Sequence, residues 1–104
     1  MRYAAIDIGS NAIRLLIKDI DESNADDLQP ERIAYYRVPL RLGGDVFERG
    51  KLSKAKTKSL VKVMVAFRNL IDVQEVAACR AVATSALRSA RNRDEVIEAV
   101  LSKT

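Results

Sequence analysis

Two short apolar runs near the start of the chain, separated by three small residues, constrain its fold most strongly. The first run covers residues 3–8, and the second places Ile13, Leu15 and Ile17 at alternate positions. A period of two is typical of a β-strand with one buried face. The intervening Gly9-Ser10-Asn11 favours a tight turn, so we predict a β-hairpin.

The middle of the chain predicts a third strand, a loop and a long helix. Residues 33–38 are rich in β-branched and aromatic side chains, and Pro39 favours an edge position or a strand end. Residues 41–45 contain two glycines and predict a loop. Ser53 is a suitable N-cap for the helix that follows. The apolar residues of that helix fall on one stripe: Leu60, Val63, Met64, Phe67, Leu70 and Ile71.

The last third of the chain predicts one more strand and two helices. Residues 76–83 are apolar almost throughout, which predicts a central, parallel strand covered by helices. Thr84 or Ser85 can begin a short helix, and Asn92 and Glu95 have the spacing of a capping box for a final helix. The inward stripe of that helix is Val96, Ile97, Val100 and Leu101. The predicted order βββαβαα is that of half a ribonuclease-H-like α/β layer.

Composition limits the chemistry and the size of the unit. There is no histidine, which excludes imidazole-based triads, histidine general bases and the usual zinc sites. The single cysteine, Cys79, cannot form an internal disulfide and is expected to be a small core residue without a chemical role. The 104 residues suffice for one compact domain but not for two domains with a cleft between them, so half a cleft is expected.

The charges are segregated along the chain. Residues 19–31 carry six acids and no base, whereas residues 49–71 carry seven bases and no acid. The basic stretch could attract a polyanion, although a lysine face on a helix is more often simply solvated. No run reaches the length of a membrane span and no signal segment precedes the first strand, so a cytoplasmic protein is expected.

The turn at residues 7–11 is the most specific candidate site. Asp7 ends the first strand, and Gly9 allows the backbone of Ser10 and Asn11 to approach a ligand closely. Such a turn can direct amide N–H groups at phosphate oxygens, while Asp7 holds a divalent cation directly or through water. An ordinary hairpin turn with an aspartate at its mouth is the alternative reading.

Two further segments could contact an anion. Thr84 and Ser85 follow the predicted parallel strand, where α/β sheets usually bind ligands, and Arg88 could clamp a phosphate with two parallel hydrogen bonds. Alternatively, one hydroxyl only caps the helix and Arg88 is solvated. Arg41 lies beside the glycine loop and could contact an anion or form a surface salt bridge.

Taken in order, these segments resemble the N-terminus of the exopolyphosphatase/guanosine pentaphosphate phosphatase (Ppx/GppA) family. That family belongs to the actin-like ATPase superfamily. The matching stretches are residues 5–17, 38–43, 50–53 and 83–92, so they are distributed along almost the whole chain. The Asp-x-Gly-Ser-Asn turn combined with Ala-Thr-Ser-Ala-Leu-Arg is specific to that family. Ala12 departs from it, because the family usually has serine there, so a hydroxyl contact from this position is absent.

The resemblance implies roles for residues of this chain. Asp7, Gly9, Ser10 and Asn11 would form the first phosphate-binding loop, with Mg²⁺ held at Asp7. Arg41 and Arg88 would line the cleft for inorganic polyphosphate or pppGpp. These roles would make residues 1–104 the N-terminal part of the first actin-like ATPase domain of a phosphoanhydride hydrolase.

The resemblance also implies that the general base is absent from this chain. The family's general-base glutamate lies in a Ser-Gly-x-Glu-Glu-Ala segment that follows the last helix here. No catalytic residue is therefore assigned to Asp94, Glu95 or Glu98. The chain alone is expected to be inactive, and its missing neighbours would leave a sheet edge exposed, which favours self-association into a homo-oligomer.

Three other functions are compatible with parts of the sequence. An ATP-dependent kinase of the same superfamily would share the Asp-x-Gly turn, but it would not be expected to carry the segment at residues 83–88. A nucleic-acid-binding module could use the basic stretch at residues 49–71, although aromatic residues for base stacking amount to only 5%. The third alternative is an inert structural fragment.

Overall fold

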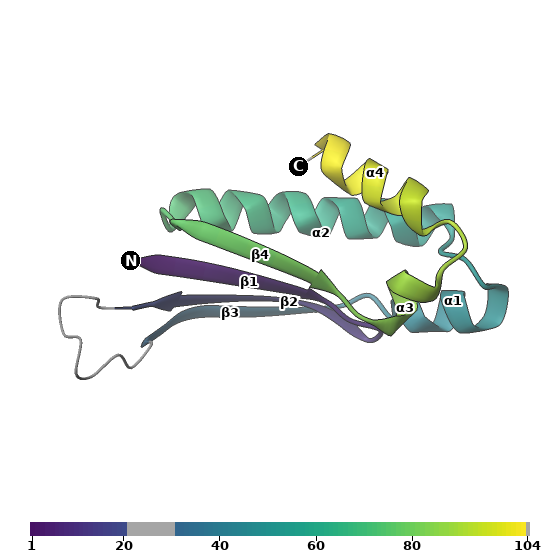
Figure 1. Ribbon diagram of the computed structural model, residues 1–104, viewed down its shortest axis with the longest axis horizontal. Helices are drawn as coiled ribbons and strands as arrows, with labels where there is room; N and C mark the ends of the chain where they lie inside the picture. Colours follow the sequence, from purple (N-terminus) through teal and green to yellow (C-terminus); the bar gives the residue numbers. More distant parts are fainter. Residues whose placement is uncertain (21–30, 104) are drawn as a thin grey trace.

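The computed structural model describes residues 1–20 and 31–103, which form one mixed sheet and the helices packed on it (Figure 1). The strands are β1 (Arg2–Ile8), β2 (Ala12–Asp19), β3 (Glu31–Pro39) and β4 (Ala78–Ala83). The helices are α1 (Leu42–Arg49), α2 (Lys54–Val73), α3 (Ser85–Ser89) and α4 (Arg93–Lys103). The acidic stretch predicted as a surface connection lies, from residue 21 to 30, outside the described residues.

The predicted hairpin is confirmed. β1 and β2 pair antiparallel from Arg2 opposite Asp19 to Ile8 opposite Ile13, and the Gly9 N–H donates to the Ala12 carbonyl at 3.0 Å. β3 adds antiparallel to β2, and β4 adds parallel to β1. The resulting sheet order is β3-β2-β1-β4.

The core lies between the sheet and α2. Ile13, Leu15 and Ile17 of β2 are fully buried, as is Leu60 of α2. Ser53 caps α2 as predicted, because its hydroxyl oxygen accepts a hydrogen bond from the Lys56 N–H. Alternate residues of β1 and β2 therefore face the helix, and the residues between them face the opposite side of the sheet.

Residues 41–45 were predicted as a loop, and this was wrong: most of them open α1. Glycine costs about 1 kcal/mol in a helix interior relative to alanine. Tertiary packing overrides that cost here, because Leu42 and Val46 are buried in the core. Gly43 also lies so close to Ser10 that an added Cβ would sit 3.1 Å from the Ser10 Cβ. The element order is thus βββααβαα rather than βββαβαα.

β4 is parallel to β1, as predicted, but it is an edge strand and not a central one. Among the described residues it pairs only with β1, and five of its six residues are exposed. Cys79 was expected in the core, yet it is exposed. Partial burial of its sulfur raises the pKa of the Cys79 thiol above the ordinary value, so the thiol stays protonated at neutral pH and is a weak nucleophile.

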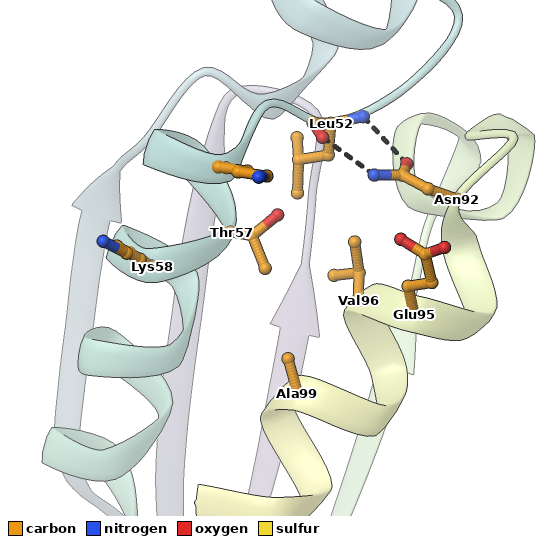
Figure 2. Close-up of a pocket in the computed structure, with 8 residues that line it drawn as sticks. Leu52, Thr57, Lys58, Asn92, Glu95, Val96 and Ala99 are labelled. Atoms are coloured by element: carbon orange, nitrogen blue, oxygen red, sulfur yellow. Dashed lines mark hydrogen bonds between the residues drawn. The ribbon is translucent and has the colours of Figure 1, made fainter.

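The end of the chain packs α4 against α2 (Figure 1). Of the predicted inward stripe, Val96 and Val100 are buried, whereas Ile97 and Leu101 are exposed. The predicted capping box does not form, because the side chain of Asn92 has another partner. Its Oδ1 accepts from the Leu52 N–H at 3.0 Å and its Nδ2 donates to the Leu52 carbonyl at 2.8 Å (Figure 2). Asn92 thereby ties the start of α4 to the segment that leads into α2.

Candidate phosphate-binding site

Three segments distant in sequence meet where β1 ends, and hydrogen bonds hold them together. The Arg41 N–H donates to the Asn11 carbonyl at 3.0 Å, and the Gly43 N–H donates to the Ser10 carbonyl at 2.8 Å. The Thr84 N–H donates to the Ile8 carbonyl at 3.0 Å. The β1–β2 turn is therefore fixed from one side by the start of α1 and from the other by the residue after β4.

The turn presents free donors at its tip. Among the described residues, no acceptor pairs with the amide N–H of Ser10 or of Asn11. Gly9 makes the tight approach possible, because an added Cβ would lie only 2.9 Å from the Ala12 carbonyl oxygen. Two adjacent unpaired N–H groups in a tight turn form a concavity that suits an anion. This geometry is compatible with a phosphate loop as well as with an ordinary turn, and phosphate binding here stays a prediction.

Asp7 lies beside this turn with one oxygen unsatisfied. Its Oδ1 is inaccessible to solvent and has no hydrogen-bond partner in the described part of the chain, while Oδ2 lies 4.0 Å from an Arg14 nitrogen. A buried, unpaired carboxylate oxygen calls for a partner such as a cation or water. The residues therefore fit Mg²⁺, which is often held by one or two carboxylates together with substrate phosphates. No cluster of three metal-binding side chains occurs among the described residues.

Arg41 has the least common backbone conformation of the site. It is the N-cap of α1 with φ 55° and ψ 49°, in the left-handed region. A residue with a Cβ pays roughly 1–2 kcal/mol for that conformation, and such strain tends to occur at functional sites. The Arg41 side chain is exposed and makes no hydrogen bond or ion pair with the described residues, so its guanidinium group is available to an anion.

Of the segment after β4, Thr84 contacts the strand that leads into the turn, whereas Ser85 and Arg88 do not bond to it. The Thr84 hydroxyl donates to the Ile8 carbonyl at 3.2 Å and makes no capping bond to α3, so the capping alternative is wrong for Thr84. Ser85 and Arg88 are exposed on α3, which contacts α1. Neither side chain makes a hydrogen bond or ion pair with another described residue, and their proposed contact with phosphate stays a prediction.

Two arginines at this site were missed by the sequence analysis. Asp7 is directly opposite Arg14 in the β1–β2 pair, and Arg14 is directly opposite Arg37 in the β2–β3 pair. Arg37 also lines an open cavity of about 630 Å³ together with Asn11, Pro39, Arg41 and Gly44. The available signal was alternation: each arginine lies between apolar residues that face the core.

Two lysines of α2 and one glutamate of α4 line a second pocket, away from the β1–β2 turn. A pocket of about 280 Å³ between these helices is lined by Lys54, Lys58 and Glu95, with Asn92 at its end (Figure 2). Lys56 serves a structural purpose, because its Nζ donates to the Leu40 carbonyl. None of these residues lines the cavity beside the turn.

Comparison with known proteins decides what this arrangement belongs to. The model of the Ppx/GppA phosphatase family matches residues 17–104. The chain belongs to this family. Its fold is accordingly the actin-like ATPase fold expected from the sequence.

Family members with solved structures are closely similar to the chain. A Ppx/GppA family member from Aquifex aeolicus shares 34% identity with a TM-score of 0.88, over 98% of this chain and 32% of that one. An exopolyphosphatase from Cytophaga hutchinsonii has the same TM-score at 25% identity, over 99% of this chain and 31% of that one.

Among curated relatives, Exopolyphosphatase 1 of Mycobacterium leprae is 30% identical over all 104 residues of this chain, which cover 30% of the relative. A bifunctional 3-dehydroquinate synthase/phosphatase from Fusobacterium nucleatum is 30% identical over 97% of this chain and 16% of its own length. The chain therefore spans less than a third of the curated relatives it matches. No helix in the described part has the length and apolar character needed to cross a membrane.

Proposed function

We propose that this chain supplies the phosphate anchor of an enzyme that hydrolyses the terminal phosphoanhydride of inorganic polyphosphate or pppGpp with Mg²⁺. The observation that carries the proposal is the pair of unpaired N–H groups at Ser10 and Asn11 beside the unsatisfied Oδ1 of Asp7. The family match favours hydrolysis over the kinase alternative. A cytoplasmic location and self-association stay predictions.

The residues of the site divide the work of binding a terminal phosphate. The N–H groups of Ser10 and Asn11 would donate to phosphate oxygens, and the exposed Arg41 guanidinium would donate to a further oxygen. Asp7 would hold Mg²⁺, which when bound neutralises phosphate charge. A carboxylate that holds a cation is a weaker base, so we do not assign the base to Asp7. A base that activates water would have to come from residues beyond this site.

Titration calorimetry with inorganic tripolyphosphate at several Mg²⁺ concentrations tests the proposal. The 104-residue chain should bind more tightly as Mg²⁺ rises, and Asp7→Asn should abolish that rise and weaken binding about tenfold in Mg²⁺. Asp94→Asn is the matched control, because Asp94 is almost fully exposed on α4. Equal effects of the two variants would refute the role of Asp7. The chain alone should release no phosphate from either substrate in a phosphate-release assay.

A further inference from the structure

A row of charged side chains crosses the face of the sheet that α2 does not cover. Asp7 of β1, Arg14 of β2 and Arg37 of β3 are consecutive register partners. Directly opposed residues share a face, and neighbouring strands lie about 4.8 Å apart, so Arg37 lies about 10 Å across the sheet from Asp7. The row thus runs from Asp7, the proposed cation ligand, out to the edge strand β3.

The two positive charges in this row are not balanced. Arg14 has Asp7 within 4.0 Å, whereas Arg37 is exposed and has no ion pair or hydrogen bond with the described residues. Like charges directly opposite each other in an antiparallel pair destabilise a sheet. An anion bound against Arg14 and Arg37 would offset this repulsion, so an anion is a favourable partner for the pair.

Arg37 and the β1–β2 turn line the same cavity. It shares the open cavity of about 630 Å³ with Asn11 and Arg41, and Pro39 lies between the two arginines in sequence. The left-handed backbone of Arg41 starts α1 at the rim of this cavity. An anion longer than one phosphate that begins at the Ser10 and Asn11 amides can therefore extend towards Arg37 through the cavity that Asn11 and Arg41 also line.

We propose that Arg37 forms a second anion-binding position, next to Arg41, that holds an inner phosphate residue of a linear polyphosphate chain whose terminal phosphate lies at the β1–β2 turn. This inference rests on the proposed function and adds to it the direction of the chain: away from Asp7, across β2, towards β3. We expect a ligand with only two phosphates to engage the turn and Arg41 but not Arg37. Arg37 therefore selects for chain length and is a binding residue, not a catalytic one.

The test compares two ligands on the 104-residue chain in Mg²⁺: pyrophosphate and long-chain linear polyphosphate. Arg37→Gln should weaken binding of the long chain about tenfold, the loss expected for one hydrogen bond to a charged group, and should change pyrophosphate affinity by less than about twofold. Arg32→Gln is the matched control, because it removes the same charge from the same strand, where Arg32 instead stacks on Tyr35.

Each outcome is decisive. Selective loss of long-chain binding in Arg37→Gln, with Arg32→Gln near wild type, supports the proposal. Equal losses in the two variants would show only general attraction of a polyanion to positive charge and would overturn it. Equal loss for both ligands in Arg37→Gln would place Arg37 at the terminal phosphate and also overturn it. If the wild-type chain binds neither ligand, the proposed function is wrong, and the inference about Arg37 is wrong with it. If the wild-type chain binds both ligands and Arg37→Gln changes neither affinity, only the inference about Arg37 is wrong.

Discussion

The two faces of the sheet carry different kinds of side chain although the same strands build them. On the covered face, Ile13, Leu15 and Ile17 are completely buried under α2. The other face carries a row of three charged side chains, Asp7, Arg14 and Arg37, at one end of the strands. The covered face holds the fold together, so the opposite face can keep unbalanced charges for a ligand without opening a hole in the core.

The largest expected difference in stability between the two faces of the sheet is at two adjacent leucines of β2. Leu15 is completely buried and Leu16 faces the other side, half-buried. Leu15→Ala should lower the free energy of unfolding by about 3 kcal/mol, because it removes buried methyl groups and leaves a cavity. Leu16→Ala should cost about 1 kcal/mol or less. Urea titration followed by circular dichroism measures both, and similar losses would show that the two faces contribute equally to stability.

A second test asks whether the helical layer depends on one side chain. Asn92 makes two hydrogen bonds to the Leu52 backbone, and its loss leaves a donor and an acceptor of that backbone unpaired. Asn92→Ala should lower the free energy of unfolding by about 2 kcal/mol. The control is Asn69→Ala, an exposed position on α2, which should change stability by less than about 0.5 kcal/mol. Thermal melts would contradict this role of Asn92 if both variants lost equally little.

A smaller effect is expected at the junction of α1 and α2, where a carboxylate is partly exposed. Hydrogen bonding from Ser53 lowers the pKa of Asp45 below its ordinary value of 3.8. A depressed carboxylate pKa stabilises the folded state above the unfolded pKa, and that contribution is lost as pH falls through the lower folded value. Asp45→Asn should therefore cost about 0.5 kcal/mol at pH 7 and nothing at a pH below both values. Unfolding curves across this pH range give the difference, and a constant difference would exclude titration of Asp45 as its cause.

The smallest expected change has the opposite sign. Arg37→Gln removes one of two like charges that lie directly opposite each other, so it should raise the free energy of unfolding by about 0.3 kcal/mol at low salt. The gain should vanish in high salt, because screening weakens repulsion between exposed charges. Denaturant titrations at two salt concentrations measure this change. A loss of stability at low salt would mean that Arg37 has a structural partner.

Much of the fold could be predicted from local patterns. The hairpin followed from alternation around Gly9, and the long helix followed from its apolar stripe and the Ser53 cap. Helix α1 could not be predicted in this way, because its two glycines disfavour a helix. That preference is reversed only by contact with Ser10 and by burial of its apolar residues in the core. The exposure of β4 could not be predicted from its sequence either, because burial of an apolar strand depends on which elements lie beside it and not on its own composition.

The candidate site was predictable to a similar extent. The turn at Asp7, Gly9 and Asn11 is contiguous in sequence, so its residues could be found together. Arg14 and Arg37 could not be joined, because 23 positions separate them and only the strand register places them opposite each other. Asn92 was misread for a related reason: its spacing to Glu95 fits a cap, but its partner Leu52 is 40 residues away.

The left-handed backbone of Arg41 has a consequence for protein engineering. Glycine adopts that conformation without strain, so replacing Arg41 with glycine would relax α1 at its first turn. A screen for variants that melt at higher temperature would therefore favour glycine at this position and discard the guanidinium group. Consensus or thermostability design on this scaffold would need a phosphate-binding readout alongside the melting temperature to retain Arg41.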